Sequence, residues 1–284
     1  MENTNTELGA RIKNERKRQK MTQQQLASGI CSQSMLSSIE NNTYIPNVIL
    51  FAQLCERLNL SLEKTLLHPY PTISQNSDFN QTIIQLCNAH HYLEMKNYLL
   101  QNKITDQLIT NSDWQTYYYY LGIATFQTSH NSHDALYNLN LANSYTDNHT
   151  TPTTLELLIR AAGAFINYLH EDRASVNLTF LSCLDDIEHD RIVAPNDNLN
   201  SIFYLYAYCL YQNTEFELGL QVINRGVTYI TAHNSHFMLA DLFLLKSVFL
   251  TSLKHPQEAK LTAQKAQSLS EIFNTELYSL ASLH

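Results

Sequence analysis

The sequence predicts an all-α protein of two domains, a small helical bundle followed by a stack of helical repeats. Glycine and proline supply only six residues each among 284. Globular chains average about 7% and 5% of these residues, so their scarcity favours long helices with few tight turns. Apolar residues make up 44% of the chain, enough for one large core or two modest ones. Charge divides unevenly, with a net +2 in residues 1–66 (8 basic, 6 acidic) and −10 in residues 67–284 (10 basic, 20 acidic).

The sequence carries no pattern typical of a membrane protein or of an oxidising compartment. Its most apolar stretch, Phe237 to Leu250, is interrupted by Asp241 and Lys246, and its beginning lacks the basic, apolar and small-residue regions of a secretory leader. The five cysteines form no C-x-x-C pair and are odd in number, which indicates reduced, packed thiols. We therefore expect a soluble cytoplasmic protein that does not bind membranes.

The first two predicted helices combine basic residues with a capping box. Leu8 and Ile12 lie four residues apart on one face of the first helix, and basic residues occupy much of the remaining surface. Thr22 and Gln25 have the spacing of a capping box, in which each side chain binds a free backbone amide at the helix start. This pair predicts a short second helix from Gln23 to about Gly29.

Three further helices complete the predicted amino-terminal bundle. Ser32 can cap a helix over 33–40, whose exposed face carries small polar side chains. Apolar residues return at helical spacing over 48–58, and Ser61 can cap a last short helix through Leu66. Five helices within residues 1–66 make a compact domain.

The spacing of these residues resembles the lambda-repressor-type helix-turn-helix domain of bacterial regulators. The matching residues are Thr22-Gln23, Leu26-Ala27, Ile39-Glu40-Asn41, Pro46 and Leu58-x-Leu60-Ser61. The resemblance implies that the 33–40 helix enters the major groove of DNA, where base edges differ in their donors and acceptors. It also implies that Arg16 turns inward and pairs with Glu40.

The candidate DNA contacts come from the 33–40 helix, its flanking turns and the first helix. Gln33, Ser34 and Ser38 would face bases, and Gln23 would bind a phosphate at a helix amino terminus. The full set is Gln23, Gln33, Ser34, Ser37, Ser38, Asn41 and Thr43, with Arg11, Lys13 and Lys17 as general electrostatic contacts. The 33–40 helix has no arginine and the turn before it is one residue short, so DNA shape and a dimer on a two-fold-related operator are expected to add specificity.

Small residues recur beyond a connector at 67–75, where His68-Pro-Tyr-Pro71 stops helix formation. The recurring sets are Gly122, Ala135 and Ala142; Gly163, Ser175 and Ser182; Ala207, Gly219 and Gly226; and Ser247, Ala259 and Ala266. Small residues let paired helices approach closely. Residues 76–284 are therefore expected to form a domain of helix pairs, with a degenerate pair over 79–102 and a capping helix over 275–283.

This pattern resembles a tetratricopeptide-like α-solenoid, in which the first helix of each pair lines the concave face. Residues six and three before the small residue, and one and four after it, would project into that face. The candidate peptide contacts are Tyr119, Phe126, Arg160, Ala164, Asn167, Ser201, Tyr204, Tyr208, Tyr211, Asp241 and Leu244. Rings, amides and one cation suit an extended peptide, with Arg160 holding a carboxylate. The alternatives are ordinary packing for the tyrosines and an ion pair with Glu156 for Arg160.

The order and size of the two domains resemble the Rgg, NprR, PlcR and PrgX family of peptide-responsive quorum-sensing regulators, most closely its PlcR branch. The segment Ile30-Cys31-x-Gln33-Ser34, with its short turn, carries the nearest similarity. The resemblance implies a homodimer whose repeat domain binds a short, secreted and re-imported peptide and thereby alters binding to double-stranded DNA. Tyr204 departs from the family, because PlcR-like grooves carry asparagine at that position.

Two other functions fit the same domain order: a DNA-tethered scaffold for a protein partner, and a phage-type repressor without a small ligand. Catalysis is not expected, because the sequence has no phosphate-binding glycine loop and no nucleophile with a base at a fixed spacing. The pairs His130/His133 and His233/His236 each offer two nitrogens, but no further ligands follow them. We therefore expect no catalytic residues, no metal site and no cofactor.

Overall fold

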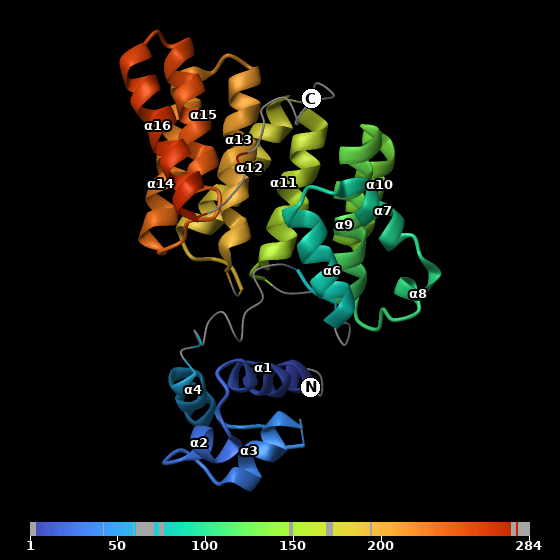
Figure 1. Ribbon diagram of the computed structural model, residues 1–284. Helices are drawn as coiled ribbons and strands as arrows, with labels where there is room; N and C mark the ends of the chain where they lie inside the picture. Colours follow the sequence, from blue (N-terminus) through green and yellow to red (C-terminus); the bar gives the residue numbers. More distant parts are fainter. Residues whose placement is uncertain are drawn as a thin grey trace. The chain divides into compact units, whose positions relative to one another are not determined.

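The computed structural model describes residues 4–41, 43–58, 60, 71–73, 77–147, 150–168, 173–193, 195–273 and 277, and over these ranges the protein is all-α (Figure 1). The chain divides into two compact units, residues 1–117 and 118–284. Each unit has its own core. The predicted connector at 67–75 and the helices predicted at 61–66 and 275–283 lie almost wholly outside the described residues.

The first unit begins with the predicted helical bundle. Its helices are α1 (Thr4–Arg18), α2 (Gln23–Ala27), α3 (Gln33–Glu40) and α4 (Val48–Arg57). The buried apolar side chains come from all four, namely Ile12, Leu26, Ala27, Leu36, Ile39, Leu50, Phe51, Leu54, Cys55 and Leu58. In α3 and α4 these residues recur at i, i+3 and i+4, so one apolar stripe of each of these helices is buried, while α1 adds Ile12 and α2 adds Leu26 and Ala27.

The predicted helix caps of α2 and α3 are confirmed. The Thr22 hydroxyl accepts from the Gln25 amide at 3.1 Å, and the Gln25 side chain accepts from the Thr22 amide at 2.7 Å. The Ser32 hydroxyl accepts from the Met35 amide at 3.1 Å. Helix α2 ends at Ala27, earlier than predicted, because the chain turns at Gly29, whose φ of +73° favours glycine.

Three short helices and the start of a long one follow in the first unit. They are α6 (Ser77–Asn88), α7 (Tyr92–Leu99), α8 (Asn102–Thr105) and α9 (Asn111–Ser129), of which α9 continues into the second unit. Helices α6 and α7 pack together as the predicted degenerate pair. The buried Asn80 side chain ties the chain before α6 to this helix by bonding both backbone groups of Ile73, at 2.8 and 3.0 Å.

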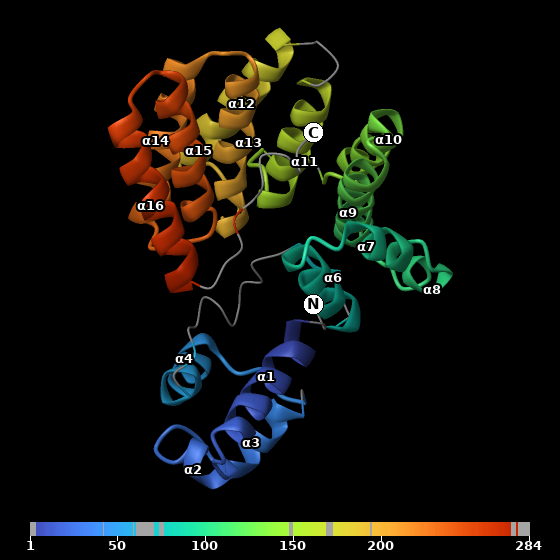
Figure 2. The ribbon, with the colours of Figure 1, turned by 45° about the horizontal axis from the view of Figure 1, so that its top comes forward.

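The second unit is a stack of helix pairs. After α9 come α10 (Ser132–Ser144), α11 (Thr154–Tyr168), α12 (Arg173–Glu188), the 3₁₀ turn η1 (Asp197–Leu199), α13 (Asn200–Gln212), α14 (Phe216–Ala232), α15 (Leu239–Ser252) and α16 (Pro256–Phe273). Consecutive helices pack as pairs, and the first helices of successive pairs also touch, α11 with α13 and α13 with α15 (Figures 1 and 2). The predicted repeat architecture is therefore present.

Glycines enforce three of the close helix approaches. A Cβ at Gly122 would lie 3.0 Å from Leu139 Cγ, one at Gly219 would lie 2.1 Å from Phe249 Cε1, and one at Gly226 would lie 2.9 Å from Phe203 Cβ. These three residues pack as the small-residue pattern predicts. Because the facing atoms belong to buried side chains, a larger residue has no space at these points.

The second set of small residues was assigned wrongly. A Cβ at Gly163 would meet no atom within 4 Å, and both Ser175 and Ser182 are exposed. The buried face of α12 begins one residue later, at Val176 and Cys183. Helices α11 and α12 still pair, but larger apolar side chains fill their contact, so the repeat here lacks the small residues of its neighbours.

Candidate nucleic-acid interface and ligand face

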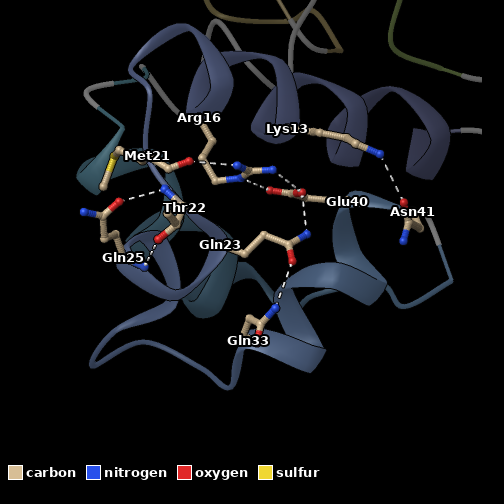
Figure 3. Close-up of polar contacts among 9 residues, drawn as sticks. All are labelled: Lys13, Arg16, Met21, Thr22, Gln23, Gln25, Gln33, Glu40 and Asn41. Atoms are coloured by element: carbon tan, nitrogen blue, oxygen red, sulfur yellow. Dashed lines mark hydrogen bonds and ion pairs between the residues drawn. The ribbon is translucent and has the colours of Figure 1, made fainter.

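A buried ion pair joins α1 to α3 (Figure 3). Arg16 Nε lies 2.6 Å from Glu40 Oε1 and Arg16 Nη2 lies 2.8 Å from Glu40 Oε2, while Arg16 Nη1 donates to the Met21 carbonyl at 2.8 Å. The Glu40 side chain is fully buried. Burial opposes ionisation, but the hydrogen bonds from Arg16 and Gln23 outweigh it and hold the pKa of Glu40 below its ordinary value. The inward pairing of Arg16 with Glu40 is confirmed.

A chain of side-chain amides leads from this pair to the surface (Figure 3). Gln23 Nε2 donates to Glu40 Oε2 at 2.9 Å, and Gln33 Nε2 donates to Gln23 Oε1 at 3.2 Å. Glu40 accepts only, so it fixes which end of the Gln23 amide points inward. The Gln23 oxygen then faces Gln33 and leaves the Gln33 oxygen and one of its N–H groups available. An amide with a free acceptor and a free donor is the group that binds adenine in the major groove.

Several other polar side chains of α3 and the turn after it are bonded within the domain. Ser38 Oγ donates to the Ser34 carbonyl, and Thr43 Oγ1 donates to the Ser38 carbonyl, each at 3.1 Å. Lys13 Nζ donates to Asn41 Oδ1 at 3.2 Å (Figure 3). Gln33, Ser34, Asn41 and Thr43 are exposed, and Ser37 and Ser38 are half-buried; Lys17 is exposed, and the side chain of Arg11 lies outside the described part of the structure.

Met35 belongs to the same surface and was not among the predicted contacts. It lies on α3 beside Ser34, and its side chain is 36% exposed. An exposed methionine offers apolar contact to the methyl group of thymine. The sequence could have indicated its exposure, because Met35 directly precedes Leu36, which lies on the buried face of the helix.

The exposed residues of α11 form a single stripe. Arg160 and Asn167 are exposed and Gly163 is half-buried between them, whereas Leu157 and Ala164, on the flank of this stripe, are buried. The open stripe therefore includes the predicted Arg160 and Asn167 but replaces Ala164 with Gly163. The prediction placed Gly163 in the contact between paired helices. In the structure α11 is rotated about its axis from that orientation, so a different set of its residues is exposed.

The predicted aromatic residues lie deeper than a groove lining requires. Tyr204 and Tyr208 are 3% and 1% exposed, and Phe126, also buried, packs edge-on against Phe165. The half-buried Tyr211 packs against Phe216 and Phe249. In the described structure these rings therefore pack between helices. Such packing was the alternative to a role in peptide contact.

The polar residues around these rings are partly exposed. Ser201 is half-buried and donates to the Asn198 carbonyl, while Gln212 donates to the Tyr208 hydroxyl at 2.7 Å. Burial, with the nearby Asp241 carboxylate, raises the pKa of Tyr204, so this phenol stays neutral. Asp241 is itself buried, whereas Tyr119 and Leu244 are half-buried. Leu205 and Gln212 are further accessible positions of α13 that the sequence rule missed.

Arg160 differs from Arg191 and Arg225, two other arginines of the second unit. Arg225 forms a bidentate pair with Glu188, with both distances 2.7 Å, and Arg191 pairs with Asp185 and Asp186. Within the described ranges Arg160 forms no ion pair. The alternative pairing with Glu156 is absent there, because Glu156 is buried and accepts from the Thr153 amide at 2.9 Å.

The comparison with family models identifies the amino-terminal domain. Residues 12–64 match the helix-turn-helix model, which covers α2, α3, α4 and the last part of α1 from Ile12 on. Residues 12–64 form a helix-turn-helix domain. Within this domain the Arg16–Glu40 pair joins α3 to α1. A search of curated protein sequences gave no match.

Solved structures match nearly the whole chain. The crystal structure of Bacillus thuringiensis PlcR in complex with the peptide PapR7 and DNA is 20% identical, with a TM-score of 0.63 over 95% of this chain and 96% of PlcR. The apo form of PlcR is 19% identical, with a TM-score of 0.58 over 94% and 95%. A transcriptional regulator from Listeria monocytogenes EGD-e is 15% identical, with a TM-score of 0.53 over 95% and 92%. The predicted resemblance to PlcR-type regulators is confirmed at the level of the fold.

No helix among the described residues is both long and apolar enough to cross a bilayer. No group of three or more His, Cys, Asp or Glu side chains among them is placed to hold a metal ion, and His130 and His133 lie at the exposed turn into α10.

Proposed function

We propose that the chain is a DNA-binding transcription regulator whose helical repeats bind a short peptide that controls DNA binding. The observation that carries the DNA-binding half is the bonded series from Arg16 through Glu40 and Gln23 to Gln33. A buried anchor that orients an exposed amide on a recognition helix is an arrangement for reading bases. The regulators that share the fold support a regulatory role rather than catalysis.

The DNA surface consists of α3, the turn after it and the basic face of α1. Gln33, Ser34 and Met35 would meet base edges, while Lys13 and Lys17 would add electrostatic attraction to phosphates. Gln23 would reach a phosphate through its backbone amide, because both ends of its side chain are engaged within the domain. One such domain buries little surface, so a homodimer on a two-fold-related operator is part of the proposal.

The ligand half of the proposal rests on the fold and on Arg160. PlcR, which shares the fold, has been crystallised with a peptide and DNA together. In this chain the open stripe of α11 carries a guanidinium with no carboxylate partner among the described residues, in a unit with 16 acidic and 8 basic residues over 118–284. A guanidinium in that setting favours a ligand with a carboxylate. This ligand would be a short secreted peptide that is imported into the cytoplasm.

Peptide binding would control DNA binding through thermodynamic linkage between the two binding equilibria. A peptide that binds one arrangement of the dimer more tightly shifts the population toward that arrangement. Moving the protein from mostly inactive to mostly active needs a differential affinity of about 10⁴.

Native mass spectrometry tests the proposal. The purified full chain is incubated with the peptide fraction of spent medium from its own culture, and the oligomer mass and adducts are read together. We expect a dimer that carries one peptide-sized adduct per subunit. A bare dimer, with secretion verified, contradicts peptide control and favours a repressor without a small ligand; a stable complex with another protein favours a scaffold.

A further inference from the structure

We propose that Gly163 is a ligand-contact position, where the missing side chain lets a peptide main chain cross α11 against the helix backbone, between Arg160 and Asn167. This inference rests on the proposed function and adds a specific place, residue and ligand chemistry to it. The ligand is an extended peptide with a carboxylate, which Arg160 would bind.

No packing contact requires a glycine at position 163. Glycine inside a helix makes the helix less stable than alanine does, so a glycine at such a position needs a structural or functional reason. Gly122, Gly219 and Gly226 each have one, because a Cβ would collide with a neighbouring helix. At Gly163 a Cβ would meet nothing within 4 Å, and the backbone is helical, so alanine fits in both respects.

The exposed side chains on either side of Gly163 suit a peptide ligand. Arg160 lies one turn before Gly163, and Asn167 one turn after it, on the same exposed stripe. Seven residues of helix rise about 10 Å, which leaves the width of one extended chain between the two side chains. Asn167 offers both a donor and an acceptor to a peptide backbone, and Arg160 offers a forked donor to a carboxylate.

The first helices of three successive pairs set the length of peptide that suits this unit. Helices α11, α13 and α15 lie side by side, and neighbouring helix axes are about 9 Å apart. A ligand that crosses all three spans about 18 Å, or about six residues of extended chain. A hexapeptide is therefore a suitable probe.

The test uses a synthetic hexapeptide pool, randomised over Leu, Phe, Gln, Asp and Gly, with free carboxyl ends. Peptides retained by the full-length wild-type chain are identified by mass and titrated against Gly163→Ala, Gly163→Leu and Ser182→Leu. The last variant adds the same side chain to an exposed position of α12. We expect Gly163→Ala to raise Tm by roughly 2–4 °C and yet weaken binding, Gly163→Leu to weaken it at least tenfold, and Ser182→Leu to bind as wild type does.

Each outcome separates this inference from the proposed function. Wild-type chain that retains no peptide contradicts the proposed function itself. Wild-type binding that Gly163→Leu preserves overturns the role of Gly163 and leaves the proposed function standing. Amidated copies of the retained peptides distinguish a terminal carboxylate from an Asp side chain, because only the former loses its charge.

Discussion

Arg16 and Glu40 join α1 to α3 through two hydrogen bonds of 2.6 and 2.8 Å, on a carboxylate that is fully buried. The same carboxylate accepts from Gln23 and thereby sets the orientation of Gln33. One buried pair therefore acts on both the folding of the helix-turn-helix domain and the orientation of the exposed Gln33 amide.

Arg16→Ala should strongly destabilise the helix-turn-helix domain. It leaves the Glu40 carboxylate buried without its cation, which costs about 3–5 kcal/mol. Hydrogen exchange of amides in residues 12–58 of the full chain measures this loss locally. Arg18→Ala is the matched control, because its pair with Glu15 is exposed on the arginine side and such pairs contribute about 0–1 kcal/mol. Equal effects of the two substitutions would contradict the structural role of Arg16.

Acidic pH should lower the stability of the helix-turn-helix domain by protonating Glu40. The folded-state pKa of Glu40 lies below its ordinary value of 4.5, so the pair stabilises the fold fully above about pH 4.5 and loses that contribution as the pH falls through the folded-state pKa. Exchange rates over residues 12–58 at pH 6 and pH 3, corrected for intrinsic exchange, follow the change. Glu40→Gln cannot titrate, so it should be less stable at pH 6 and show a smaller loss on acidification. An unchanged loss would assign the acid sensitivity to other carboxylates.

Gln33→Ala and Lys17→Ala should affect DNA binding in different ways. Loss of the Gln33 amide should cost about 1–3 kcal/mol on preferred sites and relax the preference at one base pair. Loss of the Lys17 charge should weaken binding to every sequence and lower the salt slope by about 1. Selection from a random duplex library, followed by titration at several salt concentrations, measures both. If both variants act alike on selected and random duplexes, α3 is not the reading helix.

Gln23→Ala tests whether the amide series acts as a unit. Because Gln33 Nε2 donates to Gln23 Oε1, the two substitutions should not be additive in a double-mutant cycle on a selected duplex. Strict additivity would mean that Gln33 orients itself independently of Gln23.

The helix-turn-helix domain was predictable from sequence because short-range chemistry determines it. The capping residues Thr22 and Ser32 and the apolar stripe of each helix are readable from spacing alone. For the second unit, the sequence predicted the repeat architecture but not which face of each helix is buried. Its small residues mark close approaches at Gly219 and Gly226, but Gly163 satisfies the same spacing without any contact. A one-residue error in register rotates a helix by about 100° and moves residues such as Ala164 from the open face to the buried one.

Gly219→Ala should destabilise the second unit. The added Cβ would lie 2.1 Å from Phe249 Cε1, and Phe249 is fully buried among other rings, so it cannot move aside without strain. Overpacking of this kind costs about 1–3 kcal/mol. Thermal unfolding followed by circular dichroism should show a lower Tm for Gly219→Ala. An unchanged Tm would mean that α14 and α15 are farther apart than the structure places them.

Arg160→Ala should weaken peptide binding and leave basal DNA binding intact. The guanidinium is exposed, lies in the second unit and forms no ion pair within the described ranges, so its removal breaks no ion pair of the described fold. A lost hydrogen bond between charged groups costs about 1.5–3 kcal/mol, or roughly a 10- to 150-fold weaker Kd. Titration of a retained peptide and of a selected duplex against the same preparation measures both.

The control for Arg160 is Arg225→Ala, which removes an arginine already held by Glu188 on the neighbouring helix. It should lower the stability of the α12–α14 contact and leave the peptide Kd unchanged, since its charge is neutralised within the fold. If Arg160→Ala instead reduces peptide and DNA binding equally, then it acts through the fold or the dimer, and the carboxylate of the ligand must be held elsewhere.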